Sequence, residues 1–181
     1  WAKNHLIRFL IGLFIFFFIS LIDIKLIIRL AYPLFFLNIF ALILILFIGT
    51  ETYGATRWIR FAGISLQPSE FIKVSLILCL AKYYHSIPVI EASKISRMLI
   101  PILITLIPVG LVMIQPDLGT SIIILIGAGS IFWITGINYK YFISAFALAC
   151  AAIPVGWQYL HNYQKERVYT FFNPERDPLG N

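Results

Sequence analysis

Residues 30–50 read LAYPLFFLNIFALILILFIGT, a run without a single Asp, Glu, Lys or Arg. A helix of about 20 apolar residues spans the hydrocarbon core of a bilayer, so this run is long enough to cross a membrane. Three more runs without these four residue types follow it at 98–116, 118–139 and 141–164. The four runs predict an integral membrane protein built from transmembrane helices.

The composition of the whole chain agrees with that fold class. Sixty per cent of the 181 residues are apolar and 12% are charged, and the mean hydropathy is +0.90. An ordinary soluble domain carries about 25% charged residues. The composition therefore excludes a soluble globular protein.

Two shorter apolar runs are also expected to cross the membrane. Residues 9–22 reach the required length if Arg8 extends its charge outward, and residues 71–84 carry Lys73 and Lys82 near their ends. The expected fold class is an all-α integral membrane protein, a polytopic bundle of about six transmembrane helices in a single domain over residues 1–181. The expected spans are about 6–22, 30–50, 70–85, 98–115, 119–138 and 141–160, with a loop at 51–69 and a tail at 161–181 on one side.

The net charge of +6 does not indicate a nucleic-acid partner, because the basic residues are scattered through short loops. Such residues more often set membrane topology, but they divide equally between the two sets of loops here, so orientation stays open. Cys79 and Cys150 both fall in expected spans without metal-ligand spacing. No metal site is expected.

Charged side chains concentrate in three motifs at the ends of the apolar runs. These motifs are GATRWIR at 54–60, QPSEFIK at 67–73 and QPDLGT at 115–120. A charge in or beside hydrocarbon costs about 2.5–3.5 kcal/mol on insertion scales, so such residues usually mark a functional site.

Two of the motifs share a pattern typical of helix starts. In residues 67–70 the proline takes the first helical position, where its missing N–H costs nothing, and the glutamate lies near the positive end of the helix dipole. Residues 115–117 repeat the same pattern. We therefore expect each of the two motifs to begin a helix.

The acidic and basic residues of these two motifs have alternative interpretations. Glu70 and Lys73 have the spacing of an exposed i,i+3 ion pair, yet Lys73 lies one turn inside a span, where a fixed cation could hold a phosphate. Asp117 is either a carboxylate that faces the helix dipole or a site residue. The sequence leaves both choices open.

The first motif has two interpretations as well. Arg57 beside Trp58 is typical of an interfacial anchor, but the loop over residues 50–69 could also fold back over a polar cavity. Its alternating apolar residues make a freely solvated linker implausible. We expect the loop to lie against the membrane surface or to dip into it.

Together the motifs resemble the SEDS family, the shape, elongation, division and sporulation proteins of bacteria. The resemblance rests on GAxRWI at 54–59, QPSEFxK at 67–73, QPDLGTS at 115–121, and YQxERV with NPERDPLG within 163–180. The four motifs follow the family's order across nearly the whole chain. The last region is most similar to the elongation member of the family.

The resemblance implies a fold of roughly ten transmembrane helices, of which this chain would hold the second to the seventh. The chain opens on Trp1 and not on methionine, so we interpret it as a fragment. The implied function is a peptidoglycan glycosyltransferase of the bacterial cytoplasmic membrane that polymerises lipid II for cell elongation and shape. Transfer from the undecaprenyl diphosphate-linked donor would invert the sugar, and loop 51–69 and tail 161–181 would lie on the outer face.

The resemblance also implies a set of substrate-binding residues: Arg57, Trp58, Glu70, Lys73, Asp117 and Arg167. Charge develops on diphosphate oxygens as the donor sugar leaves, and a preorganised cation stabilises such charge. The essential aspartate of the family is expected beyond Asn181, so this chain would hold no catalytic residue and be inactive alone. No cofactor is expected with certainty, although a divalent cation could share the diphosphate charge.

The implied partners are lipid II, a class B penicillin-binding transpeptidase and membrane lipid, without nucleic acid. A different class of function stays open, because midplane prolines, small-residue faces and buried charges also suit a lipid II flippase or lipid-linked transporter. A third alternative is an inactive scaffold fragment of a cell-wall complex.

Overall fold

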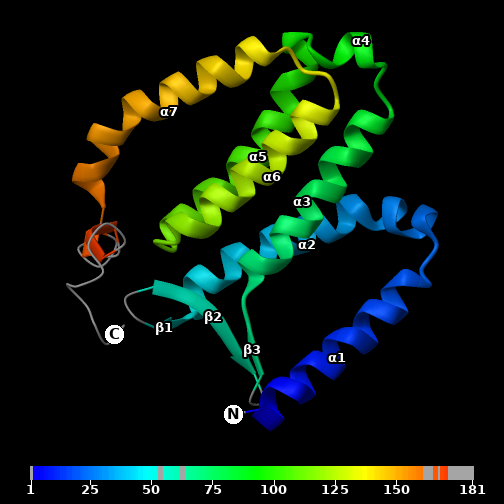
Figure 1. Cartoon of the computed structure of the whole chain (residues 1–181), viewed down its shortest axis with the longest axis vertical. Helices are drawn as coiled ribbons and strands as arrows, with labels where there is room; N and C mark the ends of the chain where they lie inside the picture. Colours follow the sequence, from blue (N-terminus) through cyan, green and yellow to red (C-terminus); the bar gives the residue numbers. More distant parts are fainter. Residues whose placement is uncertain (1, 53–54, 62–63, 161–164, 167, 171–181) are drawn as a thin grey trace. The chain divides into compact units, whose positions relative to one another are not determined.

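The computed structural model describes residues 2–52, 55–61, 64–160, 165, 166 and 168–170. Its elements follow one another in the chain as α1 (Ala2–Ser20), α2 (Ile24–Ile48), β1 (Thr50–Thr52), β2 (Ala55–Phe61), β3 (Ile64–Leu66), α3 (Pro68–His85), α4 (Val89–Ala92), α5 (Ile95–Ile114), α6 (Leu118–Ile134) and α7 (Tyr139–Tyr159) (Figure 1). The chain divides into two compact units, residues 1–131 and 132–181.

A helix occupies each stretch that was expected to span the membrane, and the all-α membrane fold is confirmed. Within the described residues, α2, α5 and α7 are long and apolar enough to cross a bilayer, and α1 and α6 contain shorter apolar helices. The short helix α4 was not expected. The number of crossings and the single-domain organisation stay predictions.

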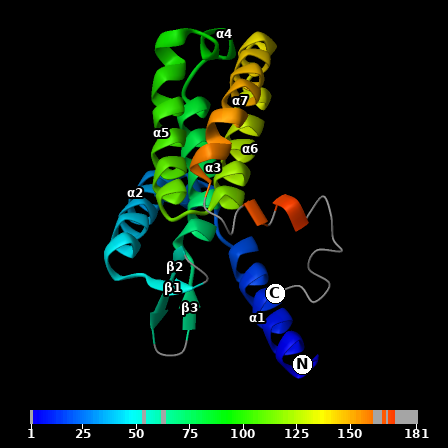
Figure 2. The ribbon, with the colours of Figure 1, turned by 90° about the vertical axis from the view of Figure 1, so that its left-hand side faces the viewer.

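The core of the first unit lies where α2, α3 and α5 pack together, and α3 contacts both of the others (Figure 2). Its fully buried apolar side chains include Leu42 and Ile45 from α2, Ile72 and Leu76 from α3, and Val112 from α5. Antiparallel α2 and α3 make the most extensive contact of the unit. This pair forms the frame on which the charged motifs are placed.

The outward surfaces of several helices are apolar. Every described side chain of α1 from His5 to Ser20 is exposed, and the large ones are nearly all Leu, Ile or Phe. Helix α7, in the second unit, buries no residue at all. Apolar faces this large are typical of surfaces that meet lipid or another membrane protein.

The loop between α2 and α3 folds as a small antiparallel sheet of order β1-β2-β3, which the sequence did not predict. Thr50 pairs with Trp58 across a bulge, and Phe61 pairs with Ile64. Thr, Trp, Ile and Phe favour extended backbone, and β2 carries all four of these residue types together with Arg57 and Arg60. The expectation that this segment lies against the membrane surface stays a prediction.

Pro33 lies inside α2 and cannot donate the hydrogen bond that the carbonyl of Arg29 would receive in a regular helix. The ammonium of Lys82 on α3 donates to that carbonyl oxygen instead, at 3.1 Å. A backbone acceptor that lacks a partner in a membrane costs several kcal/mol, so this contact stabilises the helix at its proline.

Pro101 in α5 leaves the carbonyl of Arg97 without its helical donor in the same way. The hydroxyl of Tyr83 donates to it at 3.1 Å. Two consecutive residues of α3 therefore satisfy the carbonyls that prolines release in both neighbouring helices.

Polar side chains also join the three helices inside the core. The amide of Asn38 on α2 donates to the hydroxyl of Ser75 on α3 at 3.0 Å. The amide of Gln115, which is 1% exposed at the end of α5, donates to the carbonyl of Leu42 at 3.2 Å. Such bonds fix the register of helices that have no hydrophobic preference for one another in lipid.

Candidate functional site

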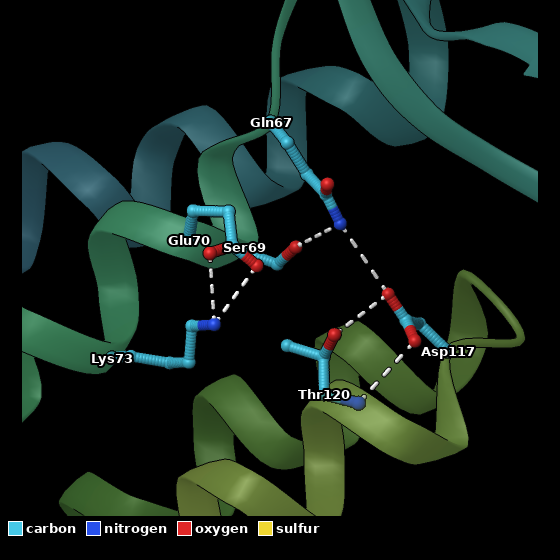
Figure 3. Close-up of polar contacts among 6 residues, drawn as sticks. All are labelled: Gln67, Ser69, Glu70, Lys73, Asp117 and Thr120. Atoms are coloured by element: carbon cyan, nitrogen blue, oxygen red, sulfur yellow. Dashed lines mark hydrogen bonds and ion pairs between the residues drawn. The ribbon is translucent and has the colours of Figure 1, made fainter. Parts of the chain in front are cut away.

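A hydrogen bond joins the two Gln-Pro motifs, although 50 residues separate their bonded side chains. Gln67 occupies the cap position before α3, and its Nε2 donates to Oγ of Ser69 at 3.0 Å and to Oδ2 of Asp117 at 3.5 Å (Figure 3). Ser69 is 1% exposed and Asp117 is 7% exposed. The starts of α3 and α6 therefore meet around buried polar groups.

Asp117 also caps α6. Its Oδ1 accepts from the backbone N–H of Thr120 at 3.3 Å, and its Oδ2 accepts from the hydroxyl of Thr120 at 2.9 Å. This is the N-cap arrangement, which satisfies a helical N–H that has no partner within the helix. The structure therefore shows Asp117 as a carboxylate at the start of α6, as one interpretation predicted, and it also shows Asp117 in contact with Gln67.

The expected repetition of the helix-start pattern is wrong in one respect. Pro68 is the first residue of α3, as predicted, whereas Pro116 lies in the turn between α5 and α6. Helix α6 begins at Leu118, one residue after its cap. The local pattern of residues 115–117 resembles a start, but Gln115 is still held at the end of α5 by the carbonyl of Val112.

Glu70 and Lys73 form a bidentate ion pair on the first turns of α3. Nζ of Lys73 lies 2.9 Å from both carboxylate oxygens of Glu70. The Lys73 side chain is 24% exposed and that of Glu70 is 54% exposed. The simpler interpretation of the spacing predicted this pair, which Figure 3 draws together with Gln67, Ser69, Asp117 and Thr120.

The first motif lies on the sheet beside this cluster. Strand β2 carries Arg57 and Trp58 and contacts both α2 and α3, at the end where α2 finishes and α3 begins (Figures 1 and 2). Trp58 is half-buried. The Arg57 side chain and all of Arg167 lie outside the described residues, so the structure assigns them no contact.

The charges at the site constrain what it can bind. Among the described side chains of the site, Glu70 and Asp117 are acidic and Lys73 is basic. A diphosphate would therefore need further positive charge, from an arginine or from a cation. Within the part of the chain that the structure describes, no group of three or more His, Cys, Asp or Glu side chains could hold a metal ion.

Sequence reasoning missed the partners that hold Asp117. Gln67, Ser69 and Thr120 were visible only as parts of the motifs, without roles of their own. The signal that could have found the contact is the shared Gln-Pro dipeptide, because each copy lies just before or at the start of a helix, α3 or α6.

Comparison with known proteins gives the chain a family. The family described as Cell cycle protein, which comprises FtsW, RodA and SpoVE proteins, matches residues 1–181. Peptidoglycan glycosyltransferase MrdB of Escherichia coli is 34% identical over 136 residues, which cover 73% of this chain and 35% of MrdB. Probable peptidoglycan glycosyltransferase FtsW of Wigglesworthia glossinidia brevipalpis is 33% identical over 182 residues, which cover 99% of this chain and 47% of that protein.

Solved structures resemble the chain in fold as well as in sequence. A chain from a structure described as "Structural coordination of polymerization and crosslinking by a peptidoglycan synthase complex" matches with a TM-score of 0.76 and 34% identity, over 93% of this chain and 50% of that one. The rod shape-determining protein RodA of Thermus thermophilus matches with a TM-score of 0.68 and 32% identity, over 77% of this chain and 46% of that one.

The chain spans half or less of the length of the proteins it matches here. The motifs, the helical membrane fold and the family match over every residue agree with one another. The chain belongs to the FtsW, RodA and SpoVE family, and it is a multi-pass protein of the bacterial cytoplasmic membrane.

Proposed function

We propose that the gene product containing this chain is a peptidoglycan glycosyltransferase of the elongation type, which polymerises lipid II. The observation that carries the proposal is the contact between Gln67 and Asp117, at 3.5 Å. It brings the motif at 67–73 against the motif at 115–120, so that residues far apart in sequence form one polar site. The names of the similar proteins support the same reaction.

The proposed site binds the diphosphate of the lipid-linked donor. Lys73 belongs to the same motif as Gln67 and Ser69 of the buried cluster, and Glu70 orients its ammonium by contacts of 2.9 Å. Negative charge grows on the diphosphate as the sugar leaves, and a fixed ammonium stabilises that charge without reorganising. Because the described carboxylates outnumber the ammonium, Arg57 and Arg167 supply the remaining positive charge, or a divalent cation does.

The acceptor hydroxyl needs a carboxylate that takes its proton. We propose that this group comes from the part of the relatives' length that residues 1–181 do not match. Glu70 and Asp117 are both engaged by partners in this chain, so they act as positioning residues. Trp58, half-buried on β2, forms the wall of the site on the side of the sheet.

A class B penicillin-binding transpeptidase is the proposed protein partner. Among the similar structures is a chain of a peptidoglycan synthase complex described as coordinating polymerization and crosslinking. Copurification of the transpeptidase from membranes tests this partner. Outer-face placement of the sheet belongs to the same proposal, because lipid II is polymerised on that face.

The test uses the purified gene product that contains residues 1–181, reconstituted in liposomes with fluorescent lipid II. Glycan chains resolved on a gel are the expected result. Movement of lipid II between leaflets without polymer would instead support the flippase alternative. Neither activity, together with retained binding to the transpeptidase, would support the scaffold alternative.

A further inference from the structure

An apolar crevice of about 300 Å³ lies between α2, α3 and α5, away from the site described above. Tyr32, Tyr83, Ile104 and Cys79 line it, together with two phenylalanines and two further isoleucines. No charged side chain is among these residues. The volume lies at the lower end of the range that pockets for small ligands occupy.

A cation lies at one edge of this crevice. The Lys82 ammonium lies 4.4 Å from the centroid of the Tyr32 ring, and the next residue, Tyr83, is part of the lining. One ammonium donor is used by the Arg29 carbonyl at 3.1 Å. An ammonium has three donors, so Lys82 can bind an anion without giving up that contact.

Two further cations lie at the same end of α2. Lys25 and Arg29 are spaced i,i+4 on one face of the helix, and both are exposed. Among the described residues, neither they nor Lys82 form an ion pair. The nearby carboxylate of Asp23 caps α2 by accepting from the backbone N–H of Lys25 at 2.9 Å. The first six residues of α2 and its cap therefore carry two cations and one carboxylate, and Lys82 adds a third cation at the Arg29 carbonyl.

We propose that this crevice and its basic edge form a binding site for an anionic phospholipid. One acyl chain occupies the crevice, and the phosphate contacts Lys82 with Arg29 beside it. The charge of the edge decides between lipids, because phosphatidylglycerol brings a net negative charge whereas phosphatidylcholine carries its own compensating cation. Basic clusters beside membrane helices attract anionic lipid in this way.

The site does not depend on the proposed glycosyltransferase reaction. Lys82 follows Lys73 by nine residues of α3, which is roughly 13 Å along a helix axis. Lys82 lies near the end of α3 and Arg29 near the start of α2, whereas the sheet joins the opposite ends of these helices. Lipid binding here and lipid II polymerisation can therefore succeed or fail separately.

Native mass spectrometry tests the proposal on the purified gene product that contains residues 1–181. The protein is equilibrated with equal parts of POPG and POPC, and the retained adducts are counted. We expect a preference for POPG of about fivefold for each cationic contact, which corresponds to the attraction of one basic residue for an anionic surface. Equal retention of the two lipids would overturn the proposal.

Three charge variants locate the headgroup contact. Lys82→Met and Arg29→Met should each lower the POPG preference. Arg29→Met changes only the side chain, so the hydrogen bond from Lys82 to the backbone carbonyl of residue 29 is preserved. Lys94→Met is the matched control, since Lys94 is paired with Glu91 at 2.8 Å. A preference that falls as far in Lys94→Met as in Arg29→Met would reject the specific site.

A second pair of variants locates the acyl chain. Ile104→Trp fills the crevice and should reduce retention of both lipids, whereas Leu106→Trp on the same helix points elsewhere, since Leu106 is 51% exposed and does not line the crevice. Equal retention in these two variants would show that the chain does not lie in the crevice.

Discussion

The Lys82 ammonium on α3 lies 3.1 Å from the carbonyl oxygen of Arg29, the acceptor in α2 that Pro33 leaves without its helical donor. The hydroxyl of the neighbouring Tyr83 donates to the carbonyl oxygen of Arg97 in α5, which Pro101 leaves without its helical donor. Each proline lies in a helix where a side chain from α3 reaches the carbonyl that has lost its helical donor. The prolines and the residues that compensate for them therefore form coupled pairs.

The first pair can be tested by a double-mutant cycle. Lys82→Met should lower the free energy of unfolding by about 1–3 kcal/mol, because the Arg29 carbonyl loses a charged donor. In a Pro33→Ala background the restored N–H satisfies that carbonyl, so the same change should cost less. Thermal unfolding in lipid-free detergent measures both values. Equal costs in the two backgrounds would show that Lys82 does not act through this carbonyl.

The second pair predicts a smaller coupling, since a neutral hydroxyl is the donor. Tyr83→Phe should cost about 0.5–1.5 kcal/mol of unfolding free energy, and close to nothing when Pro101→Ala is also present. Tyr141→Phe in α7 is the control, because it removes a hydroxyl that forms no hydrogen bond among the described residues. Chemical unfolding in the same detergent provides the comparison.

Asp117 is predicted to stabilise the start of α6, because it caps that helix through Thr120. Asp117→Ala removes the cap on Thr120 and should cost about 0.5–2 kcal/mol of stability, whereas Asp117→Asn keeps an acceptor and should cost little. The polymerisation rate of Asp117→Asn then measures what the charge of Asp117 contributes to activity, because this variant keeps the cap. If the Asn variant is both stable and fully active, Asp117 is a capping residue without a role in substrate binding.

Lys73 is predicted to be needed for polymerisation and not for folding. Lys73→Met removes the proposed diphosphate contact, and the loss of one preorganised electrostatic group lowers kcat by about 10² to 10³. Glu70→Gln should reduce kcat less, because the ammonium stays but is less firmly oriented. Gel analysis of glycan chains from matched amounts of membrane-inserted protein gives the rates. Near-normal rates in Lys73→Met would remove that residue from the site.

Glu91 gives a prediction about pH outside the spans. The hydrogen bond from Lys94 at 2.8 Å, and then the charge of Lys94, hold the pKa of Glu91 below its ordinary value of 4.5. A lowered pKa means that the pair stabilises the fold above the ordinary value, and that this contribution is lost as the pH falls through the folded pKa. An NMR titration of Glu91 should show the low value, and Lys94→Met should raise it. An unchanged titration in that variant would contradict the assigned cause.

Local sequence was sufficient to place the helices. Uninterrupted apolar runs predicted most of the ends of α2, α5, α6 and α7 to within a few residues. Such runs form helices because every backbone polar group must be satisfied in lipid. Pro68 marked the start of α3 correctly for a similar reason, since its ring fits the first helical position and few others. The charged motifs likewise identified the family without any structure.

Local sequence was not sufficient where the answer depends on a distant partner. The residues of β2 do not by themselves predict a sheet, which forms only because β2 pairs with β1 and β3. Pro116 lies in a turn because Gln115 is still bound to the end of α5 and to Leu42 of α2. Val112 is only three residues from Gln115, but Leu42 is 73 residues away, so no local pattern could reveal that second contact.

The amino-acid sequence by itself determined the membrane class, the positions of the helices and the family, since hydropathy and short motifs act over a few neighbouring residues. Tertiary structure alone decided which polar groups meet: Gln67 with Asp117, Lys82 with Arg29 and Tyr83 with Arg97. These contacts join residues 14 to 53 positions apart. Their partners are chosen by how the helices pack, because a buried polar group in lipid must find its hydrogen bond wherever the fold places one.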